Sequence, residues 1–598
     1  MTGSRSGSSP VAQSVRRGGA ADPGERLVVD CFGCSGSIFL SVSHSVLHYD
    51  VRQLCSANRS AVENEECYGF QWLRPGCAEG LPQPVSGAFL LLSGPLLCRP
   101  SAEYVGGIVR GAAAGHHGVL RQLPAEVSGC VVTAERVVVF RGPSSPDQIY
   151  FRRTGRRVTW SSDPRDLFQG HRPEFDQETI WRSCRAEDVF IYPDLERLEF
   201  GELAVLGPCS TRTEEYWPTA PLELPRRTTL REYAHLAYQL LLEEVRPYAH
   251  GADGCGDRVG ILLSGGVDSS TVLAALVDHG ADVVAYHMGT DDPLADEAHY
   301  VDQVCRHLSV PLVTIPRSTE DDLFSVRGDF PHPYNHGWRS PLERVADRIA
   351  ADGVHVLLSG LEGDVVFGPV RYGLHDLITG DIRRREKWRM LQGMATTRWE
   401  LRRILRSIRP SYSLYADPEA YAETELSSDF LTPMPDAAPE QFAPTFSAQE
   451  FALNYGLWRP HGIHLAKPWG GHRLRRLAAR LPNAYRVLPF AGRTIDKPVL
   501  RLAAADRLPP AVWRHYGRTW LDSPEENWCL HHPDAFARIL GAPDTRLVAM
   551  GIVDPQRLGD VLANPAAIRR NADSLLCSSM VELFLRDLES KTGTDQRS

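Results

Sequence analysis

Lysine is almost absent from this chain of 598 residues. Only four lysines (Lys387, Lys467, Lys497 and Lys591) accompany 61 arginines, a bias typical of a GC-rich genome rather than of a particular function. A lysine that is retained under this bias is therefore a slightly stronger functional candidate than usual. The net charge is −9 and no basic stripe is present, so a nucleic-acid partner is not expected.

Long apolar runs and an ordered cysteine pattern are missing as well. No run approaches the ~18 apolar residues of a membrane-spanning helix, so no membrane contact is expected. The single C-x-x-C, from Cys31 to Cys34, has no second pair at zinc-ribbon spacing, and the 13 cysteines are expected to be reduced core thiols. His461 and His464 could share a helix face, but with no third ligand nearby they are expected to be structural.

The length exceeds what one hydrophobic core supports and predicts several domains. Residues 1–25 contain an arginine pair without a following apolar segment, which predicts a disordered tail without an export signal and a cytoplasmic location. Short alternating apolar runs predict a β-rich domain over 26–224. An alternating strand and helix pattern predicts an α/β domain over 226–598, mostly helical after about 380.

A strand, a glycine turn and a helix follow one another in residues 259–276, VGILLSGGVDSSTVLAAL. The two glycines allow a tight turn with inward N–H groups, the serine hydroxyls add donors, and the helix directs its positive end at the same point. This combination predicts a pyrophosphate site, and an acid within it predicts a bridging divalent cation. The residues expected at this site are Ser264, Gly265, Gly266, Asp268, Ser269 and Ser270.

Further strands are predicted at 282–289, 310–316 and 354–360, separated by helices. A preceding helix is predicted over 230–249. This order indicates a doubly wound parallel sheet with its site at the carboxyl ends of the strands.

The motif SGGVDSS resembles the pyrophosphate loop (PP-loop) of ATP pyrophosphatases, which split ATP into AMP and pyrophosphate while adenylating an acceptor. The chain is most similar to the asparagine-synthetase-like branch, which includes asparagine synthetases, β-lactam synthetases and the macrolactam synthetases of lasso-peptide biosynthesis. Residues 354–368, VHVLLSGLEGDVVFG, resemble the second signature of this branch, so Asp364 is implied to hold Mg²⁺ together with Asp268. The resemblance also implies main-chain contacts to the adenine of ATP from Leu262, Met288, Ser359 and Gly360.

Residues 137–168 and 192–217 resemble parts of the N-terminal glutamine-amidotransferase-like domain of asparagine synthetases. A working domain of this type carries a cysteine directly after the initiator methionine, whose α-amine activates its own thiol. This chain has Thr2 there, and its first cysteine, Cys31, follows an apolar run typical of a strand. The resemblance therefore implies an amidotransferase-like domain that lacks its nucleophile.

The residue after Gly360 distinguishes members of the branch. Asparagine synthetases carry a catalytic glutamate there and β-lactam synthetases a tyrosine, whereas this chain has Leu361, which cannot move a proton. Glu362 is either a displaced base or a carboxylate that lies behind the site or is linked to Mg²⁺. A peptide α-amine, with a pKa near ~8, needs little help from a base.

Residues 463–482 and 494–518 resemble two later stretches of the branch. Relatives place a lysine after the second Leu-Pro, where it contacts the phosphates and stabilises charge during acyl transfer. The corresponding position here is assigned to Arg518, with Arg514 before it, and Lys497 is the nearest lysine. Each of these residues either contacts the α-phosphate or lies on a solvated helix face.

The resemblance implies an ATP- and Mg²⁺-dependent ligase that forms an amide bond. The expected member is a lasso-peptide macrolactam synthetase, whose partners are a precursor peptide, a leader peptidase and a leader-recognition protein. A glutamine-hydrolysing asparagine synthetase and a β-lactam-synthetase-like enzyme remain alternatives, and a tRNA-modifying PP-loop ATPase is a remote one.

Overall fold

The computed structural model describes part of the chain, in which two compact units are present, Met1–Pro173 with Tyr192–Pro218, and Glu174–Ile191 with Thr219–Ser598. Segment 174–191, predicted within the N-terminal domain, thus groups with the second unit. The described residues are 28–32, 69–72, 81–82, 89–93 and 102–595, without 133–136, 146–147, 155–156, 162–163, 169–172, 186, 188, 193–194, 207–210, 218–219, 251–257, 319–320, 325–331, 334–338, 369–371, 397–400, 410–426, 434–453, 491–492 and 517–522.

The first unit contains a seven-stranded sheet in the order β11-β10-β6-β5-β4-β2-β3. Buried residues of its central strands, such as Val131, Val138 and Phe140, pack with Ile108 of helix α2 (Ala102–Ala113). The strands are β2 (Gly69–Trp72), β3 (Leu81–Pro82), β4 (Phe89–Ser93), β5 (Ser128–Val132), β6 (Val137–Phe140), β10 (Glu202–Leu206) and β11 (Thr211–Glu215).

A second sheet of this unit has the order β1-β8-β7-β9. Its strands are β1 (Val28–Phe32), β7 (Tyr150–Thr154), β8 (Arg157–Ser161) and β9 (Glu196–Arg197), and the short helix η2 (Pro164–Phe168) follows β8. The antiparallel pair β7–β8 and the helix after it lie within 137–168, one of the two stretches that resemble the amidotransferase-like domain. Cys31 lies within β1, opposite Trp160 of β8, whereas Cys34 lies outside the described residues.

The second unit is built on a five-stranded sheet in the order β14-β13-β12-β15-β16, with every neighbouring pair parallel. This confirms the parallel α/β sheet, with four strands close to their predicted positions. The edge strand β16 was not predicted. The strands are β12 (Val259–Leu262), β13 (Val283–Thr290), β14 (Leu312–Arg317), β15 (Val356–Ser359) and β16 (His464–Ala466).

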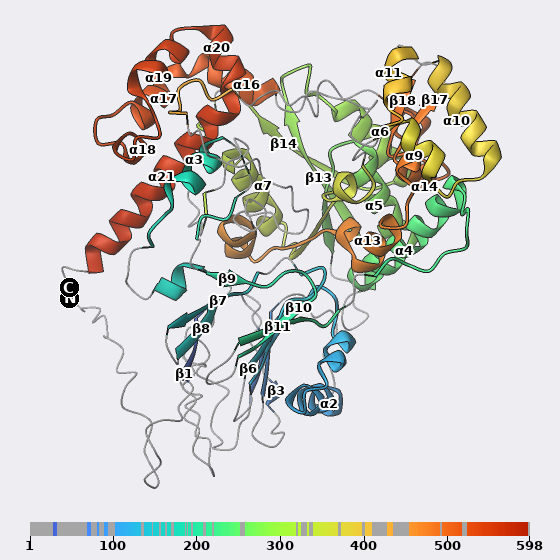
Figure 1. Cartoon of the computed structure of the whole chain (residues 1–598), viewed down its shortest axis with the longest axis horizontal. Coiled ribbons are helices and arrows are strands. Elements are labelled where there is room, and N and C mark those ends of the chain that lie inside the picture. The colour runs from blue at the N-terminus through green and yellow to red at the C-terminus, as the bar shows by residue number, and fades with distance from the viewer. Residues whose placement is uncertain are drawn as a thin grey trace. The chain divides into compact units, whose positions relative to one another are not determined.

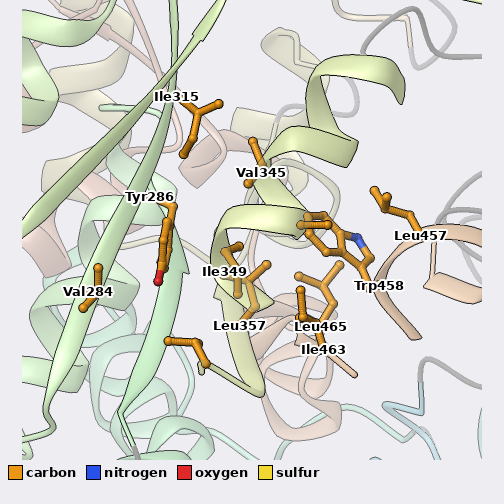
Figure 2. Close-up of a cluster of buried hydrophobic side chains, with 12 residues drawn as sticks. Val284, Tyr286, Ile315, Val345, Ile349, Leu357, Leu457, Trp458, Ile463 and Leu465 are labelled. Atoms are coloured by element: carbon orange, nitrogen blue, oxygen red, sulfur yellow. The ribbon is translucent and has the colours of Figure 1, made fainter. Parts of the chain in front are cut away.

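Apolar side chains of the sheet, of helix α7 (Arg339–Ala351) and of the segment 457–465 form a buried core. In Figure 1, α7 lies beside the green strands β13 and β14, and it packs against both. Figure 2 shows Trp458 among the side chains of this cluster, and its indole is fully buried. The labelled members are Val284, Tyr286, Ile315, Val345, Ile349, Leu357, Leu457, Trp458, Ile463 and Leu465.

Helices flank the sheet and make up most of the C-terminal part, as expected. The predicted helix before the nucleotide loop is α4 (Leu230–His250), and it packs on α5 (Val267–Asp278). None of the described helices is long and apolar enough to cross a membrane. The other helices near the site are α6 (Ala298–Leu308), α8 (Gly363–Phe367), α13 (His472–Ala478), α14 (Pro498–Ala504) and α15 (Pro510–Trp513).

A helical arm, α9 (Leu374–Thr379), α10 (Arg384–Thr396) and α11 (Leu401–Arg406), lies between β15 and β16 in the sequence. Helix α10 packs on the hairpin β17 (Val487–Phe490) and β18 (Arg493–Asp496), beside which Figure 1 draws it. The remaining helices of the unit are α3 (Gln177–Cys184), α16 (Ser523–His531), α17 (Pro533–Leu540), α18 (Arg546–Ala549), α19 (Pro555–Leu562), α20 (Pro565–Arg570) and α21 (Ala572–Asp595).

Candidate active site

The predicted pyrophosphate loop forms the turn between β12 and α5. Gly265 has φ +86°, a left-handed conformation that favours glycine, and the next residue, Gly266, caps the helix. The Ser264 and Ser269 hydroxyls lie 3.2 Å apart, and Ser264 Oγ accepts a hydrogen bond from Gly266 N at 3.3 Å. The hydroxyl of Ser270 is buried and has no hydrogen-bond partner in the described part of the chain. Hydroxyl donors and the amino end of a 12-residue helix thus converge on one turn.

Two glycines of the second signature bring it directly against this loop. A Cβ at Gly360 would lie 2.4 Å from Ser269 N, and a Cβ at Gly363 would lie 2.8 Å from Asp268 Cγ. Any side chain at Gly360 would collide with backbone atoms that cannot move aside. The predicted proximity of the two signatures is therefore present and depends on these glycines.

Asp268, Asp364 and Lys497 form a group that we name the shared-lysine cluster. Lys497 Nζ lies 2.5 Å from Asp268 Oδ2 and 2.5 Å from Asp364 Oδ1. The side chain of Asp268 is 17% exposed and that of Asp364 is 64% exposed. The two predicted metal ligands thus approach the same ammonium group, one from inside the protein and one from its surface.

The charges of this cluster do not balance, since one lysine faces two carboxylates. Burial raises the pKa of the Asp268 carboxyl, Lys497 partly offsets that effect, and Asp364 adds to the increase. Burial alone would lower the pKa of Lys497, but the two carboxylates outweigh it and raise this pKa. Lys497 therefore stays charged at neutral pH.

Glu362, Lys467 and Arg475 form a second group, which we name the paired-glutamate cluster. Glu362 Oε1 lies 3.1 Å from Lys467 Nζ, and Oε2 accepts a hydrogen bond from Arg475 Nη2 at 2.5 Å. The Glu362 side chain is only 10% exposed. Burial would raise its pKa, but the two cations outweigh burial and lower it.

This geometry bears on the two roles that the sequence left open for Glu362. Both of its oxygens are engaged by cations and its lowered pKa weakens it as a proton acceptor. Its backbone has φ 71°, a strained conformation for a residue with a side chain. The arrangement favours a carboxylate behind the site that fixes the turn between Gly360 and Asp364.

The residues predicted to contact adenine lie at one edge of the sheet. Leu262 of β12 pairs with Ser359 of β15 on one side and with Tyr286 of β13 on the other. Met288 lies two residues beyond Tyr286, at the same end of β13, and Gly360 follows Ser359. The four predicted positions are therefore at the carboxyl ends of adjacent strands, as the fold requires of a binding edge.

The remaining predicted residues are not all placed. Arg518 lies outside the described residues. Arg514 is exposed and its guanidinium lies over the ring of Trp513. His461 contacts Asp347 at 3.2 Å, and no group of three His, Cys, Asp or Glu suited to a metal occurs among the described side chains.

Three residues of the site were not predicted from the sequence. Trp469 Nε1 donates a hydrogen bond to the backbone oxygen of Asp268 at 3.1 Å, and Lys467 and Arg475 hold Glu362. All three follow β16, which was not predicted. The scarcity of lysine could have pointed to Lys467, because two of the four lysines in the chain are paired with carboxylates at this site.

The donor set suits Mg²⁺ and a phosphate chain. Asp268 Oδ1 is buried without a hydrogen-bond partner in the described part of the chain, and the carboxylates of Asp268 and Asp364 converge on Lys497 Nζ. Carboxylate oxygens are the ligands that Mg²⁺ prefers, and buried hydroxyls beside a helix amino end suit phosphate oxygens. Asp268 and Asp364 would hold the metal, and Ser264, Ser269 and Ser270 would face the phosphates.

Parallel strands, a glycine turn into a helix and paired carboxylates near the strand ends are typical of nucleotide-binding α/β domains. The model of the asparagine synthase family matches residues 256–586, more than half of the chain. The chain belongs to the asparagine synthase family, whose members are ATP-dependent ligases.

Other comparisons add little to this assignment. No curated protein matches the chain. The solved structure of glutamine phosphoribosylpyrophosphate amidotransferase from B. subtilis, complexed with ADP and GMP, is 11% identical in sequence. The match covers 39% of this chain and 71% of that chain with a TM-score of 0.18, too low to support an argument about fold or function.

Proposed function

We propose that this protein is an AMP-forming ligase that closes a macrolactam ring in a peptide. A side-chain carboxylate oxygen of Asp or Glu attacks the α-phosphorus of ATP, which forms an acyl adenylate and releases pyrophosphate. The peptide's N-terminal amine then attacks the acyl carbon, loses a proton and displaces AMP. The shared-lysine cluster and the serines of the loop support the first step.

The single observation that carries the peptide assignment is the surface around Leu361. Leu361 is 44% exposed and Val365 is 50% exposed, on the turn and helix that also carry Asp364. An apolar, accessible surface next to the carboxylates suits a peptide better than a small charged amino acid. It also offers no proton acceptor, which a terminal amine with a pKa near ~8 does not require.

The chain's own residues have separate tasks in this proposal. Lys497, held charged between two carboxylates, supplies positive charge beside the phosphate chain. The paired-glutamate cluster fixes the turn after Gly360. Mg²⁺ bound by Asp268 and Asp364 would neutralise charge on the leaving pyrophosphate. The partners in this proposal are a precursor peptide, a leader peptidase and a leader-recognition protein.

Mass spectrometry of peptide products tests the proposal. Leaderless peptides with a free amine and one internal Asp or Glu, incubated with ATP and Mg²⁺, should lose the mass of one water while AMP accumulates. Fragmentation should trace the new bond to residue one and the acidic side chain. ATP cleavage driven by free aspartate, with glutamine or ammonia as nitrogen source, would instead identify an asparagine synthetase. Cleavage driven by a β-amino acid would identify a β-lactam-type enzyme.

A further inference from the structure

Tyr300 and His515 form a hydrogen-bonded pair that the proposed reaction has not used. Tyr300 lies on α6 and His515 follows α15. The Tyr300 hydroxyl lies 2.6 Å from His515 Nδ1, and the two ring centroids are 4.5 Å apart. Two segments more than 200 residues apart in the sequence thus hold one imidazole in a defined orientation.

The pair lies close to the pyrophosphate loop, because Tyr300 of α6 is near Gly265. A Cβ at Gly265, the left-handed residue of the loop, would lie 3.1 Å from Tyr300 Cβ. A side chain at Gly265 would therefore press on Tyr300. The loop turn therefore lies close to the start of the Tyr300 side chain, whose hydroxyl reaches His515 Nδ1.

The pair is also attached to the shared-lysine cluster through Arg501 of α14. Arg501 Nη1 donates a hydrogen bond to the backbone oxygen of His515 at 2.8 Å. Arg501 Nη2 pairs with Asp496 at 2.6 Å, and Asp496 directly precedes Lys497. The segment from Asp496 to Arg501 therefore contacts the His515 backbone and also carries Lys497.

One of the two ring nitrogens of His515 is not used by the pair with Tyr300. His515 Nε2 is buried and has no hydrogen-bond partner in the described part of the chain. Burial lowers the pKa of this histidine and the Arg501 charge lowers it further, so the ring is neutral at pH 7. When the Tyr300 hydroxyl donates to Nδ1, the ring proton is on Nε2, and that N–H becomes a donor.

We propose that His515 is a phosphate-binding residue that donates an Nε2–H hydrogen bond to the triphosphate of ATP or to pyrophosphate. Tyr300 is the positioning residue that fixes the tautomer. A buried donor of this kind requires an acceptor, and the anion expected at the adjacent loop supplies one. The inference rests on the nucleotide-binding part of the proposed function and not on its peptide substrate.

Calorimetric titration with pyrophosphate and Mg²⁺ tests the role of His515 without any acceptor substrate. His515→Leu removes the donor and should weaken pyrophosphate binding about tenfold to a hundredfold, as expected for a hydrogen bond to a charged group. His515→Gln keeps an N–H donor at a similar position and should recover most of the affinity. Tyr300→Phe should weaken binding by about threefold, because the ring keeps its donor but loses its fixed tautomer.

His531→Leu is the matched control, because His531 ends α16 and bonds only to the Asn527 backbone in the described structure. Unchanged affinity in His515→Leu, or equal losses in the Leu and Gln variants, would overturn the inference. If His515→Leu does not fold, the pyrophosphate affinities of the other two variants decide the question. Affinities that decrease from the wild type to His515→Gln and then to Tyr300→Phe support the inference, and unchanged affinity in both variants overturns it. If the wild-type protein binds no pyrophosphate, the assignment of the nucleotide site itself is wrong. If it binds pyrophosphate normally but cyclises no peptide, only the proposed reaction is wrong.

Discussion

The shared-lysine cluster and the paired-glutamate cluster have opposite charge balance, although Asp364 of the first and Glu362 of the second are only two residues apart in the sequence. The shared-lysine cluster places Lys497 between Asp268 and Asp364, whereas the paired-glutamate cluster places Glu362 between Lys467 and Arg475. The first has an excess of negative charge and a carboxylate that is 64% exposed. The second has an excess of positive charge and a carboxylate that is 10% exposed.

The difference separates a binding arrangement from a structural one. Excess carboxylate that is open to solvent can accept a divalent cation, whereas a carboxylate that is enclosed by two cations cannot. Both clusters hold a strained backbone, since Lys497 has φ 45° and Glu362 has φ 71°. Such strain persists only where surrounding contacts fix it, which the ion pairs do here. The following predictions test this division, beginning with the largest expected effect.

Removing either carboxylate of the shared-lysine cluster should abolish catalysis without unfolding the protein. Asp268→Asn and Asp364→Asn should each lower pyrophosphate release by about 10³-fold or more, because charge stabilisation worth several kcal/mol is lost. Their melting temperatures should stay near that of the wild type. Asp381→Asn, in an exposed pair with Arg227, is the control and should leave pyrophosphate release unchanged. Near-normal release in either active-site variant would remove the metal-site assignment.

Breaking the paired-glutamate cluster should act on stability. Glu362→Gln leaves Lys467 and Arg475, whose side chains are only 15% and 25% exposed, without their carboxylate, which should cost about 3–5 kcal/mol in the free energy of unfolding. Asp282→Asn breaks the exposed pair with Arg258 and should cost less than about 1 kcal/mol. Urea titration of the two variants measures both. Equal and small losses would show that Glu362 is not a structural carboxylate.

The pH dependence of stability gives an independent check on Glu362. Its folded-state pKa lies below the ordinary 4.5, so its charged form stabilises the fold above pH 4.5, and this contribution is lost as the pH falls through the lowered pKa. The difference in unfolding free energy between wild type and Glu362→Gln should therefore be constant from pH 8 to pH 5 and shrink below about pH 4.5. A difference that grew toward acid pH would contradict the ion pairs.

The smallest effect is expected at Leu361. Because this side chain is half exposed, Leu361→Glu should change the free energy of unfolding by no more than about 0.5 kcal/mol. The wild-type cyclisation rate should rise with pH through the amine's titration range near ~8, and the new carboxylate should flatten that rise. Parallel pH–rate profiles of wild type and variant would show that position 361 does not face the acceptor.

The shared-lysine cluster could be approached from the sequence because its parts belong to local patterns. Asp268 lies in a strand–turn–helix pattern and Asp364 follows a strand, and parallel strands bring their carboxyl ends together. Lys497 was noticed because lysine is rare. The position of Lys497 between the two aspartates depends on the strained turn after β18, which no hydrophobic periodicity in the sequence predicts.

The paired-glutamate cluster could not be assembled from the sequence. Glu362 and Arg475 are 113 residues apart, and their meeting depends on β16, a three-residue edge strand too short for an alternating pattern. For the same reason, segment 174–191 could not be assigned to the second unit, because its grouping depends on long-range packing of α3 on α21.

Gly360 and Leu361 stand side by side under opposite steric constraints. Any substitution at 360 would place a Cβ 2.4 Å from Ser269 N, whereas the next side chain is 44% exposed. If the proposed function holds, substitutions at position 361 can therefore change the acceptor chemistry without crossing a stability threshold. The nucleotide machinery beneath it would be inherited unchanged, so one ancestral scaffold can give rise to ligases with different acceptors.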